Sequence, residues 1–402
     1  MSFCEYADMT KIDQAFDERI VAADRIPVAA YVLTAGIGVI GANSLVLSPI
    51  APEVSRSLGA TVPVVMMASA VFGLGTAASA LFLARHIDRL GASRMLRLAM
   101  GLLGVALLVS ALSPVVAVLI AAQLGAGLAS GVALPAIYAS AAAVATPGRE
   151  ARTIGIVLIG WTLSMVAGVS LSAVLADVVH WRAVYGAVAL LAAAAVIALS
   201  VIPIRDNPAS GPAPMPLTAL KLPGVKPLLL ACVCFMTGFY GVYGYLGDYV
   251  HQTLGQPVSA NGLVALIYGI GFGGSALLDG FADRVGARRL LPIAFLAVTT
   301  VYLFLALFSG SFASVLLFIG LWGLANHFGL NLLIMRLTAI DPTQRGTIMG
   351  LNSGVTYLAV FVGTTGFGPI YANYGFATVV YVAMALMIVA AGAALWPGPR
   401  PR

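Results

Sequence analysis

Charge is scarce in this chain. Asp, Glu, Lys and Arg make up 9% of its 402 residues, whereas a soluble domain contains about 25%. Hydrophobic residues account for 60% of the sequence, and the mean hydropathy is +1.00. This composition excludes a soluble globular protein and predicts an integral membrane protein.

Reactive residues are also few. The three cysteines are an odd set, with Cys4 in a polar segment and Cys232 and Cys234 in an apolar run, which fits neither a disulfide framework nor a zinc site. The sequence contains no catalytic triad, cluster of metal ligands or phosphate-binding loop. We therefore expect no enzymatic activity, no catalytic residue, no bound metal and no cofactor.

Two glycine motifs imitate a nucleotide-binding signature. Gly36–Gly41 (GIGVIG) and Gly269–Gly274 (GIGFGG) both match the dinucleotide pattern GxGxxG. That pattern indicates a nucleotide site only where it follows a strand and opens a helix. Both copies lie inside long apolar runs, so they predict glycines that allow helices to pack closely.

The apolar runs predict an all-α protein with twelve transmembrane helices. A helix that crosses a bilayer needs about 20 mostly apolar residues, so the runs between successive charges show how many helices fit. Three long runs hold two helices each, with hinges near residues 113–114, 309–311 and 373–375. Six shorter runs hold one helix each: 25–53, 56–85, 152–177, 182–205, 226–248 and 248–279.

The basic residues predict the orientation. With twelve spans, all of the 21 Lys and Arg residues except Arg56 and Arg182 fall on the side of the two termini. Short loops rich in Lys and Arg stay in the cytoplasm. Both termini are therefore predicted to be cytoplasmic, and the net charge of +6 reflects this loop bias and not an affinity for nucleic acid.

A charged turn sequence occurs twice in the chain. DRLGASRML begins at Asp88 and DRVGARRLL begins at Asp283, 195 positions later (88 to 283). Each copy falls between the second and third predicted helix of its half, and a segment with six prolines between Arg205 and Pro227 separates the halves. These features predict a duplicated bundle with an N-terminal tail (1–26), two six-helix bundles (27–204 and 227–396), a linker (205–226) and a C-terminal tail (397–402).

Through this repeat the sequence resembles the major facilitator superfamily, in particular its twelve-span branch of drug and metabolite efflux proteins, the drug:proton antiporters and arabinose-efflux permeases. The D-R-x-G core of the family signature GxxxDRxGRR is matched twice, although Ala84 and Asp279 replace its first glycine. The resemblance implies two pseudo-symmetric six-helix bundles. It also implies a cytoplasmic latch between them, formed by Asp88, Arg89, Gly91, Arg94, Asp283, Arg284, Gly286 and Arg288.

The repeated core also has a simpler physical interpretation. A short turn between two helices needs a residue that tolerates positive φ, as Gly91 and Gly286 do. An aspartate near a helix start accepts amide hydrogen bonds, and the flanking arginines pair with it or with lipid phosphate. The alternative to a latch is therefore a plain anchor at the cytoplasmic surface.

The fourth and fifth helices depart from the family pattern. Efflux proteins usually carry an arginine, often implicated in proton coupling, where this chain has Gln123, and a proline where it has Ser170. Other positions agree with the family, namely Gly127, Gly131, Gly160, Gly168, Trp181 and Arg182. On balance the sequence favours an antiporter.

The resemblance implies that the first, fourth, seventh and tenth helices line a central cavity. Tyr240 and Tyr243 are three positions apart on the seventh helix, so their rings share a face that suits a small polar or partly aromatic solute, although aromatic residues also anchor helices at membrane surfaces. The polar residues of the four helices are the candidate substrate-binding residues: Asn43, Ser44, Gln123, Tyr240, Tyr243, Asn326, His327 and Asn331.

Two residues are candidates for proton coupling. His327 lies near the middle of the tenth helix, with Asn331 on the same face, and histidine is the side chain best suited to exchange protons near neutral pH. The alternative is a neutral histidine satisfied by a neighbouring helix. Asp248 lies near the outer end of the seventh helix and forms a candidate outer gate with His251, the alternative being a solvated helix end.

Together these features predict a monomeric secondary transporter of the bacterial inner membrane that works by alternating access. Its expected partners are a small-molecule substrate, protons and membrane lipids. We expect proton-coupled export of a small neutral or zwitterionic organic compound, such as a sugar, an amino-acid-like metabolite or an uncharged antibiotic, because no carboxylate is placed near the bilayer midplane. The alternatives are proton-linked uptake of a small metabolite and a transport-inactive receptor or lipid-handling relative.

Overall fold

A computed structural model describes residues 26–83, 91–145, 150–202, 204, 215–278, 280 and 284–396, and the described elements are helical. Helices are expected because a bilayer offers no partners for unpaired backbone amides and carbonyls. The first half contains α2 (Val28–Leu45), α3 (Leu47–Leu58), α4 (Val62–Phe82), α6 (Ala92–Leu112), α7 (Val116–Val144), α8 (Glu150–Leu163), η2 (Ser164–Val169), α9 (Ser170–Val178) and α10 (Trp181–Val201). The second half contains η3 (Pro216–Lys221), α11 (Val225–Asp248), η4 (Tyr249–Thr253), α12 (Ala260–Gly274), η5 (Ser275–Leu278), α14 (Ala287–Phe308), α15 (Phe312–Thr338), η6 (Pro342–Gln344) and α16 (Arg345–Ala394).

The helices account for the twelve predicted spans. Ten helices within the described residues are long and apolar enough to cross a membrane. The eighth span is the shorter α12, of 15 residues. α16 contains two spans, because Gly375 has a non-helical backbone (φ 79°) and divides it into residues 345–374 and 376–394. This break falls at the hinge predicted near residues 373–375.

The two halves form two bundles with matching internal contacts. Gly127 of α7 approaches the Phe72 carbonyl of α4 so closely that a Cβ atom would overlap it. Gly323 of α15 makes the same approach to the Tyr268 carbonyl of α12, and each residue of this second pair lies 196 positions after its counterpart (127 to 323, 72 to 268). Close approach of small residues is how helices associate in a bilayer, where lipid removes most of the hydrophobic driving force.

Turn glycines repeat in the same way and define the two ends of the molecule. Gly59 (φ 61°) and Gly255 (φ 64°) lie at one end, and Gly91 (φ 87°) and Gly286 (φ 91°) lie at the other. Each has the positive φ that glycine adopts without strain, which confirms the role predicted for Gly91 and Gly286. We call the two ends the Gly59 face and the Gly91 face.

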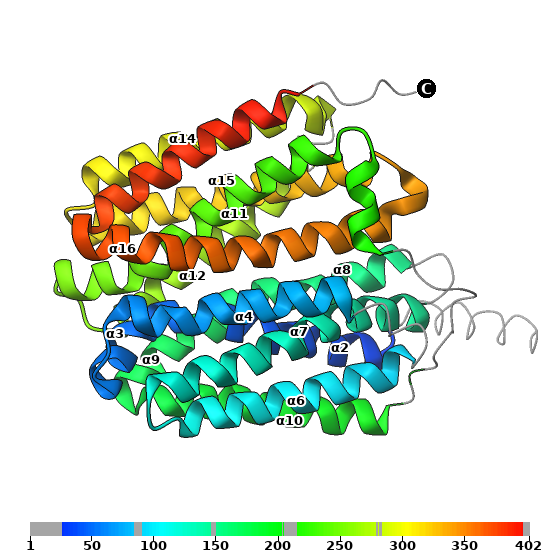
Figure 1. Ribbon diagram of the computed structural model, residues 1–402, viewed down its shortest axis with the longest axis horizontal. Coiled ribbons are helices and arrows are strands. Elements are labelled where there is room, and N and C mark those ends of the chain that lie inside the picture. Colours follow the sequence, from blue (N-terminus) through cyan, green and yellow to red (C-terminus); the bar gives the residue numbers. More distant parts are fainter. Residues whose placement is uncertain are drawn as a thin grey trace, which may run out of the picture.

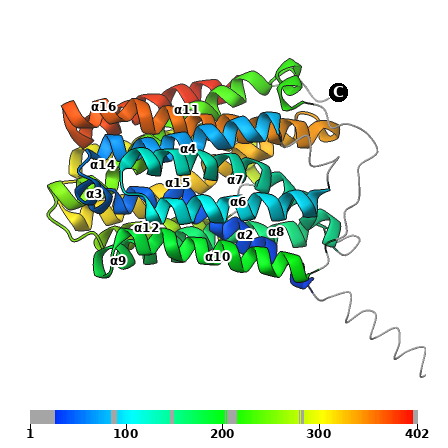
Figure 2. The same cartoon turned by 60° about the horizontal axis from the view of Figure 1, so that its bottom comes forward.

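The bundles pack along several helix pairs. In Figure 1 the helices of the second half lie above those of the first, and Figure 2 shows α4 beside α16. Contacts also join α11 to α3 and α12 to α9. Both glycine motifs are helix contacts as predicted, since a Cβ on Gly41 would meet Ser164 and one on Gly271 would meet the Gly320 backbone.

Candidate site and gate between the two bundles

Hydrogen bonds join the two bundles toward the Gly59 face. The Tyr243 hydroxyl of α11 donates to the Leu45 carbonyl at the end of α2, at 3.2 Å. The Ser48 hydroxyl of α3 donates in return to the Tyr243 carbonyl. Both side chains are buried, Ser48 being 4% and Tyr243 6% exposed, so these bonds are shielded from water.

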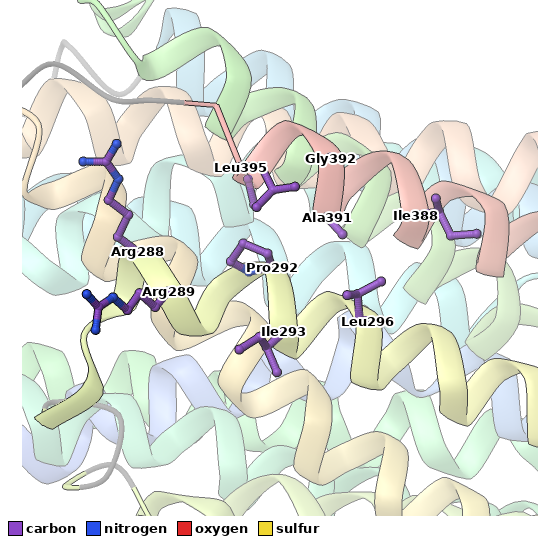
Figure 3. A pocket seen from close by; sticks show the side chains of 10 residues that line it. Arg288, Arg289, Pro292, Ile293, Leu296, Ile388, Ala391, Gly392 and Leu395 are labelled. Carbon is purple, nitrogen blue, oxygen red and sulfur yellow. The ribbon is translucent and has the colours of Figure 1, made fainter.

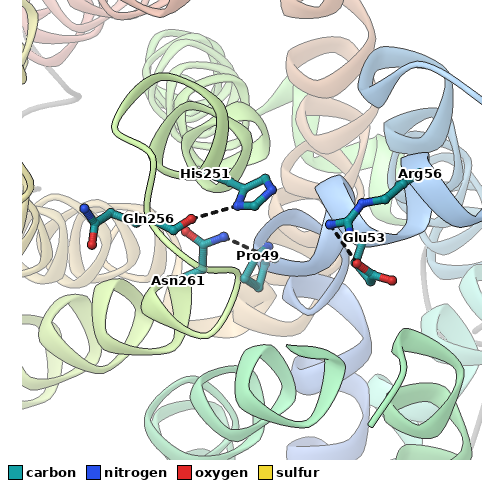
Figure 4. A network of polar contacts seen from close by, with 6 residues as sticks. All are labelled: Pro49, Glu53, Arg56, His251, Gln256 and Asn261. Carbon is teal, nitrogen blue, oxygen red and sulfur yellow. Dashed lines mark hydrogen bonds and ion pairs between the residues drawn. The ribbon is translucent and has the colours of Figure 1, made fainter. Parts of the chain in front are cut away.

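Asn261 in the first turn of α12 adds a second link between the bundles. Its Nδ2 donates to the Pro49 carbonyl of the first bundle at 2.8 Å and to the Gly247 carbonyl of the second at 3.1 Å. Figure 4 shows Asn261 reaching Pro49, with the Glu53–Arg56 ion pair (2.9 Å) nearby. We call Leu45, Ser48, Pro49, Tyr243, Gly247 and Asn261 the Gly59-face gate.

The gate also depends on Gly247, where the α11 backbone lies against the backbone of Ser48 and Pro49. A Cβ on Gly247 would lie 2.6 Å from the Ser48 carbonyl oxygen and 3.0 Å from the Pro49 Cα. Both neighbours are backbone atoms, which cannot move aside by changing rotamer. The gate can therefore close in this way only around a residue without a side chain.

Aromatic hydroxyls from both bundles gather next to the gate. The Tyr240 hydroxyl of α11 lies next to the Ser44 side chain of α2. Tyr357 of α16 lies near Tyr240 and near Tyr138 of α7. Trp161 Nε1 of α8 donates to the Tyr138 hydroxyl at 3.4 Å. We call Tyr138, Tyr240, Tyr243, Tyr268 and Tyr357 the tyrosine cluster.

An amide completes this region on the side of the second bundle. Asn326 Nδ2 of α15 donates to the Tyr268 hydroxyl of α12 at 2.9 Å. Asn326 is 2% exposed, and its Oδ1 has no hydrogen-bond partner among the described residues. A buried amide oxygen without a partner is costly, so this oxygen is a candidate acceptor for a bound solute.

Asn43 and Gln123 meet each other inside the first bundle. Asn43 Nδ2 donates to Gln123 Oε1 at 3.0 Å, and Gln123 Nε2 donates back to Asn43 Oδ1 at 3.2 Å. Gln123 Nε2 also donates to the Ser110 hydroxyl of α6 at 3.1 Å. Gln123, which occupies the position of the family's arginine, thus holds α2, α6 and α7 together.

His327 lies on α15, one turn before Asn331, and both side chains are partly exposed. Its ring makes an edge-on contact with Phe272 of α12, with 5.2 Å between the ring centres. His327 directly follows Asn326, whose side-chain amide donates to the Tyr268 hydroxyl. This arrangement leaves both of its predicted roles, substrate binding and proton coupling, as proposals.

Asp248 is not a solvated helix end, and that alternative is wrong. The helix continues past it as η4, and its side chain is 7% exposed. Its Oδ2 accepts a 2.6 Å hydrogen bond from the Tyr371 hydroxyl of α16, whereas its Oδ1 has no partner within the described part of the chain. Nearby, His251 Nδ1 lies 2.7 Å from the Gln256 carbonyl oxygen, as Figure 4 shows.

The predicted latch is described only in part. Asp88, Arg89 and Asp283 lie outside the described residues. Gly91 and Gly286 are the N-cap residues that directly precede α6 and α14. The side chains of Arg94, Arg284 and Arg288 are exposed at the Gly91 face.

Sequence reasoning missed several residues of the gate and cluster. Asn261 and Ser48 carried a visible signal, because each is a polar residue within an apolar stretch. Tyr138, Tyr268 and Tyr357 lie on the fourth, eighth and eleventh spans, and tyrosines are common at membrane surfaces. The side of a helix that faces the other bundle cannot be read from one uniformly apolar span.

Two duplicated six-helix bundles that meet around a polar cluster are the architecture of a membrane transporter. A family profile described as the Major Facilitator Superfamily matches residues 33–364. The chain belongs to this superfamily and is a multi-pass membrane transporter of that class.

Relatives and a solved structure agree with this assignment. The chain is 29% identical over 370 residues to the uncharacterized MFS-type transporter YwfA of Bacillus subtilis, covering 90% of this chain and 89% of YwfA. It is 26% identical to YbcL of the same organism, covering 89% and 93%. A bacterial homologue of the human lysosomal transporter Spinster, crystallised inward-facing and unoccupied, has the same fold, with a TM-score of 0.74 at 15% identity and coverage of 93% and 98%.

Proposed function

We propose that this protein is a proton-coupled secondary transporter of the bacterial inner membrane that exports a small neutral or zwitterionic organic compound. The Gly91 face is cytoplasmic, because the basic residues of the chain concentrate in the loops at that end. The substrate binds between the bundles, next to the closed Gly59-face gate. Transport follows when the bundles rock about this site.

The proposal rests on one observation. Hydroxyl and amide groups from both bundles lie together beside the Gly59-face gate, and short-range contacts between the bundles hold that gate closed. Ser44 and Tyr138 belong to the first bundle, and Tyr240, Tyr357 and Asn326 to the second. A solute held by both bundles couples its own binding to their relative movement.

The chemistry of this cluster suggests the substrate class. Its groups are phenol and alcohol hydroxyls and an amide, which donate and accept hydrogen bonds without carrying a formal charge. Phe239 stacks on Tyr243 with 5.6 Å between ring centres and packs on Trp322 at 5.3 Å, so the same region presents aromatic faces. Such a surface suits a neutral or zwitterionic solute with both polar and apolar parts.

Proton coupling is assigned to Asp248 and His327. Asp248 is a buried carboxyl one residue from Gly247 of the gate. Tyr371 and His251 are the titratable groups that act on it, and Tyr245 and Tyr249 lie around Tyr371. Opening the gate would expose this carboxyl to the outer solution, so that its proton occupancy follows the conformation. His327 lies beside the site and would exchange its proton with the cytoplasm.

Solute uptake into inside-out membrane vesicles tests the proposal. With an acidic lumen, an exported sugar, amino acid or neutral antibiotic should accumulate inside, and a protonophore should abolish the accumulation. Tyr240→Phe removes the hydroxyl next to Ser44 and should raise the solute concentration for half-maximal uptake. Tyr185→Phe is the matched control, because the Tyr185 hydroxyl is buried on α10 without a partner among the described residues.

The same assay separates the alternatives. Solute that leaves preloaded vesicles together with protons from an acidic lumen would indicate proton-linked uptake by the cell instead of export. Solute binding without flux under any gradient would indicate a receptor and would contradict the proposal.

A further inference from the structure

A groove lies on the second bundle at the Gly91 face, between the start of α14 and the end of α16. Its volume is about 900 Å³. Figure 3 shows Arg288 and Arg289 at one end of it, with Pro292 and Leu296 of α14 facing Ile388 and Leu395 of α16. The groove is separate from the gate and the tyrosine cluster, and of the predicted latch residues it contains Arg288.

The groove is positively charged. Arg288 and Arg289 are exposed and form no ion pair within the described residues, where Glu53–Arg56 is the salt bridge present. Arg336 of α15 lies close enough to Arg288 to repel it. The start of α14 adds the positive end of a helix of 22 residues.

The opposite wall does not offset this charge. The end of a helix normally presents carbonyls with partial negative charge. Here the Leu395 amide donates to the Ala391 and Gly392 carbonyls, and the Arg336 guanidinium donates to the Ala394 carbonyl. These terminal carbonyls of α16 already accept hydrogen bonds, and Arg288 and Arg289 are the charged residues that line the groove.

The floor of the groove is apolar and lies at the edge of the membrane. Leu296 is 50% and Ile388 52% exposed on helices long enough to span a bilayer, so their side chains face lipid. Trp396, which is 65% exposed just past α16, marks the level of the headgroups, where tryptophan concentrates. A ligand here meets cations at headgroup depth and hydrocarbon below them.

We propose that this groove is a binding site for one anionic phospholipid, with its phosphate between Arg288 and Arg289 and an acyl chain along Leu296 and Ile388. Guanidinium groups bind phosphate through paired hydrogen bonds. A free anion would match the arginines but would leave the apolar floor uncovered. The site does not depend on the proposed transport activity, since an inactive protein would bind the lipid equally well.

Native mass spectrometry of the detergent-purified protein, titrated with phosphatidylglycerol or phosphatidylcholine of the same acyl chains, tests this site. We expect one phosphatidylglycerol to bind with clear preference over phosphatidylcholine. Arg288→Gln with Arg289→Gln should weaken that binding about thirtyfold. Lys221→Gln with Lys226→Gln is the matched control, because it removes the same charge at the Gly91 face from exposed residues outside the groove and should leave the bound lipid in place.

A second variant distinguishes a lipid from a free anion and keeps the test valid if the double arginine variant does not fold. Ile388→Trp fills the apolar floor and retains both arginines, so it should weaken phosphatidylglycerol binding about tenfold. Inorganic phosphate at millimolar concentration should not displace the lipid. Equal binding of both lipids, full binding by the arginine variant, or displacement by inorganic phosphate would each overturn the proposal.

Discussion

The Gly59-face gate gives the most quantitative prediction, through Asn261. Asn261→Ala removes the 2.8 Å bond to Pro49 and the 3.1 Å bond to Gly247. A side-chain hydrogen bond between membrane helices contributes about 0.6 kcal/mol on average and up to about 1.7 kcal/mol. Only the Pro49 bond joins the two bundles, so its loss should raise the ratio of open to closed gate about threefold, and by up to about twentyfold.

Gly247→Ala should have a larger effect for a steric reason. Its new Cβ would lie 2.6 Å from the Ser48 carbonyl oxygen, whereas ordinary contact begins at 3.4 Å. The backbones must separate before the gate can close, so the open state should predominate. Gly101→Ala is the matched control, because a Cβ there meets no atom within 4 Å.

Distances between spin labels measure this equilibrium. Val115 of the first bundle and Gln252 of the second are exposed at the Gly59 face and can be labelled after the three native cysteines are replaced. The wild type should give mainly one short distance by double electron-electron resonance. Asn261→Ala should add a longer one, and Gly247→Ala should favour it. An unchanged distribution in both variants would refute the reasoning about the gate.

Three further predictions concern other buried contacts. Asp248→Asn, which imitates the protonated carboxyl, should abolish any change of the same label distances between pH 5 and pH 8, and a pH response equal to that of the wild type would remove Asp248 from the coupling. Gln123→Leu leaves Asn43 without its amide partner and should lower the free energy of unfolding by about 2 kcal/mol. A lower melting temperature in detergent would show this loss, whereas an unaltered melting temperature would argue against a structural role of Gln123. Gly127→Ala and Gly323→Ala would each push a Cβ into a carbonyl of the neighbouring helix, so both should lower the melting temperature, and tolerance of either would contradict the equivalence of the two bundles.

The spans could be predicted because their physical basis lies in the sequence itself. Uncharged runs of sufficient length must become helices in a bilayer, and glycine tolerates the positive φ found at Gly91 and Gly286. The break in α16 at Gly375 was visible for the same reason. These features depend on local composition and not on which helices become neighbours.

The site could be predicted only in part, because it depends on the rotation of each helix and on its partners. Asn43 and Gln123 were expected to line a cavity, but Ser110 on the third span helps to satisfy them within one bundle. Tyr240 and Tyr243 both face the first bundle, as their spacing on one helix face allows, yet the neighbours that they meet there, Ser44 and the Leu45 carbonyl, could not be deduced from spacing. Burial of Asp248 follows from the π-helical continuation η4 and from Tyr371, which lie in separate parts of the sequence.

Internal pH in proteoliposomes that contain only the purified protein tests the central claim most directly. Sugars, amino acids and neutral antibiotics are added in turn to the wild type and to His327→Gln. We predict a proton flux that one solute class elicits in the wild type and that is lost in the variant. Flux that persists undiminished in His327→Gln would remove His327 from the mechanism, and absence of flux with every solute would contradict proton-coupled transport of a neutral or zwitterionic compound.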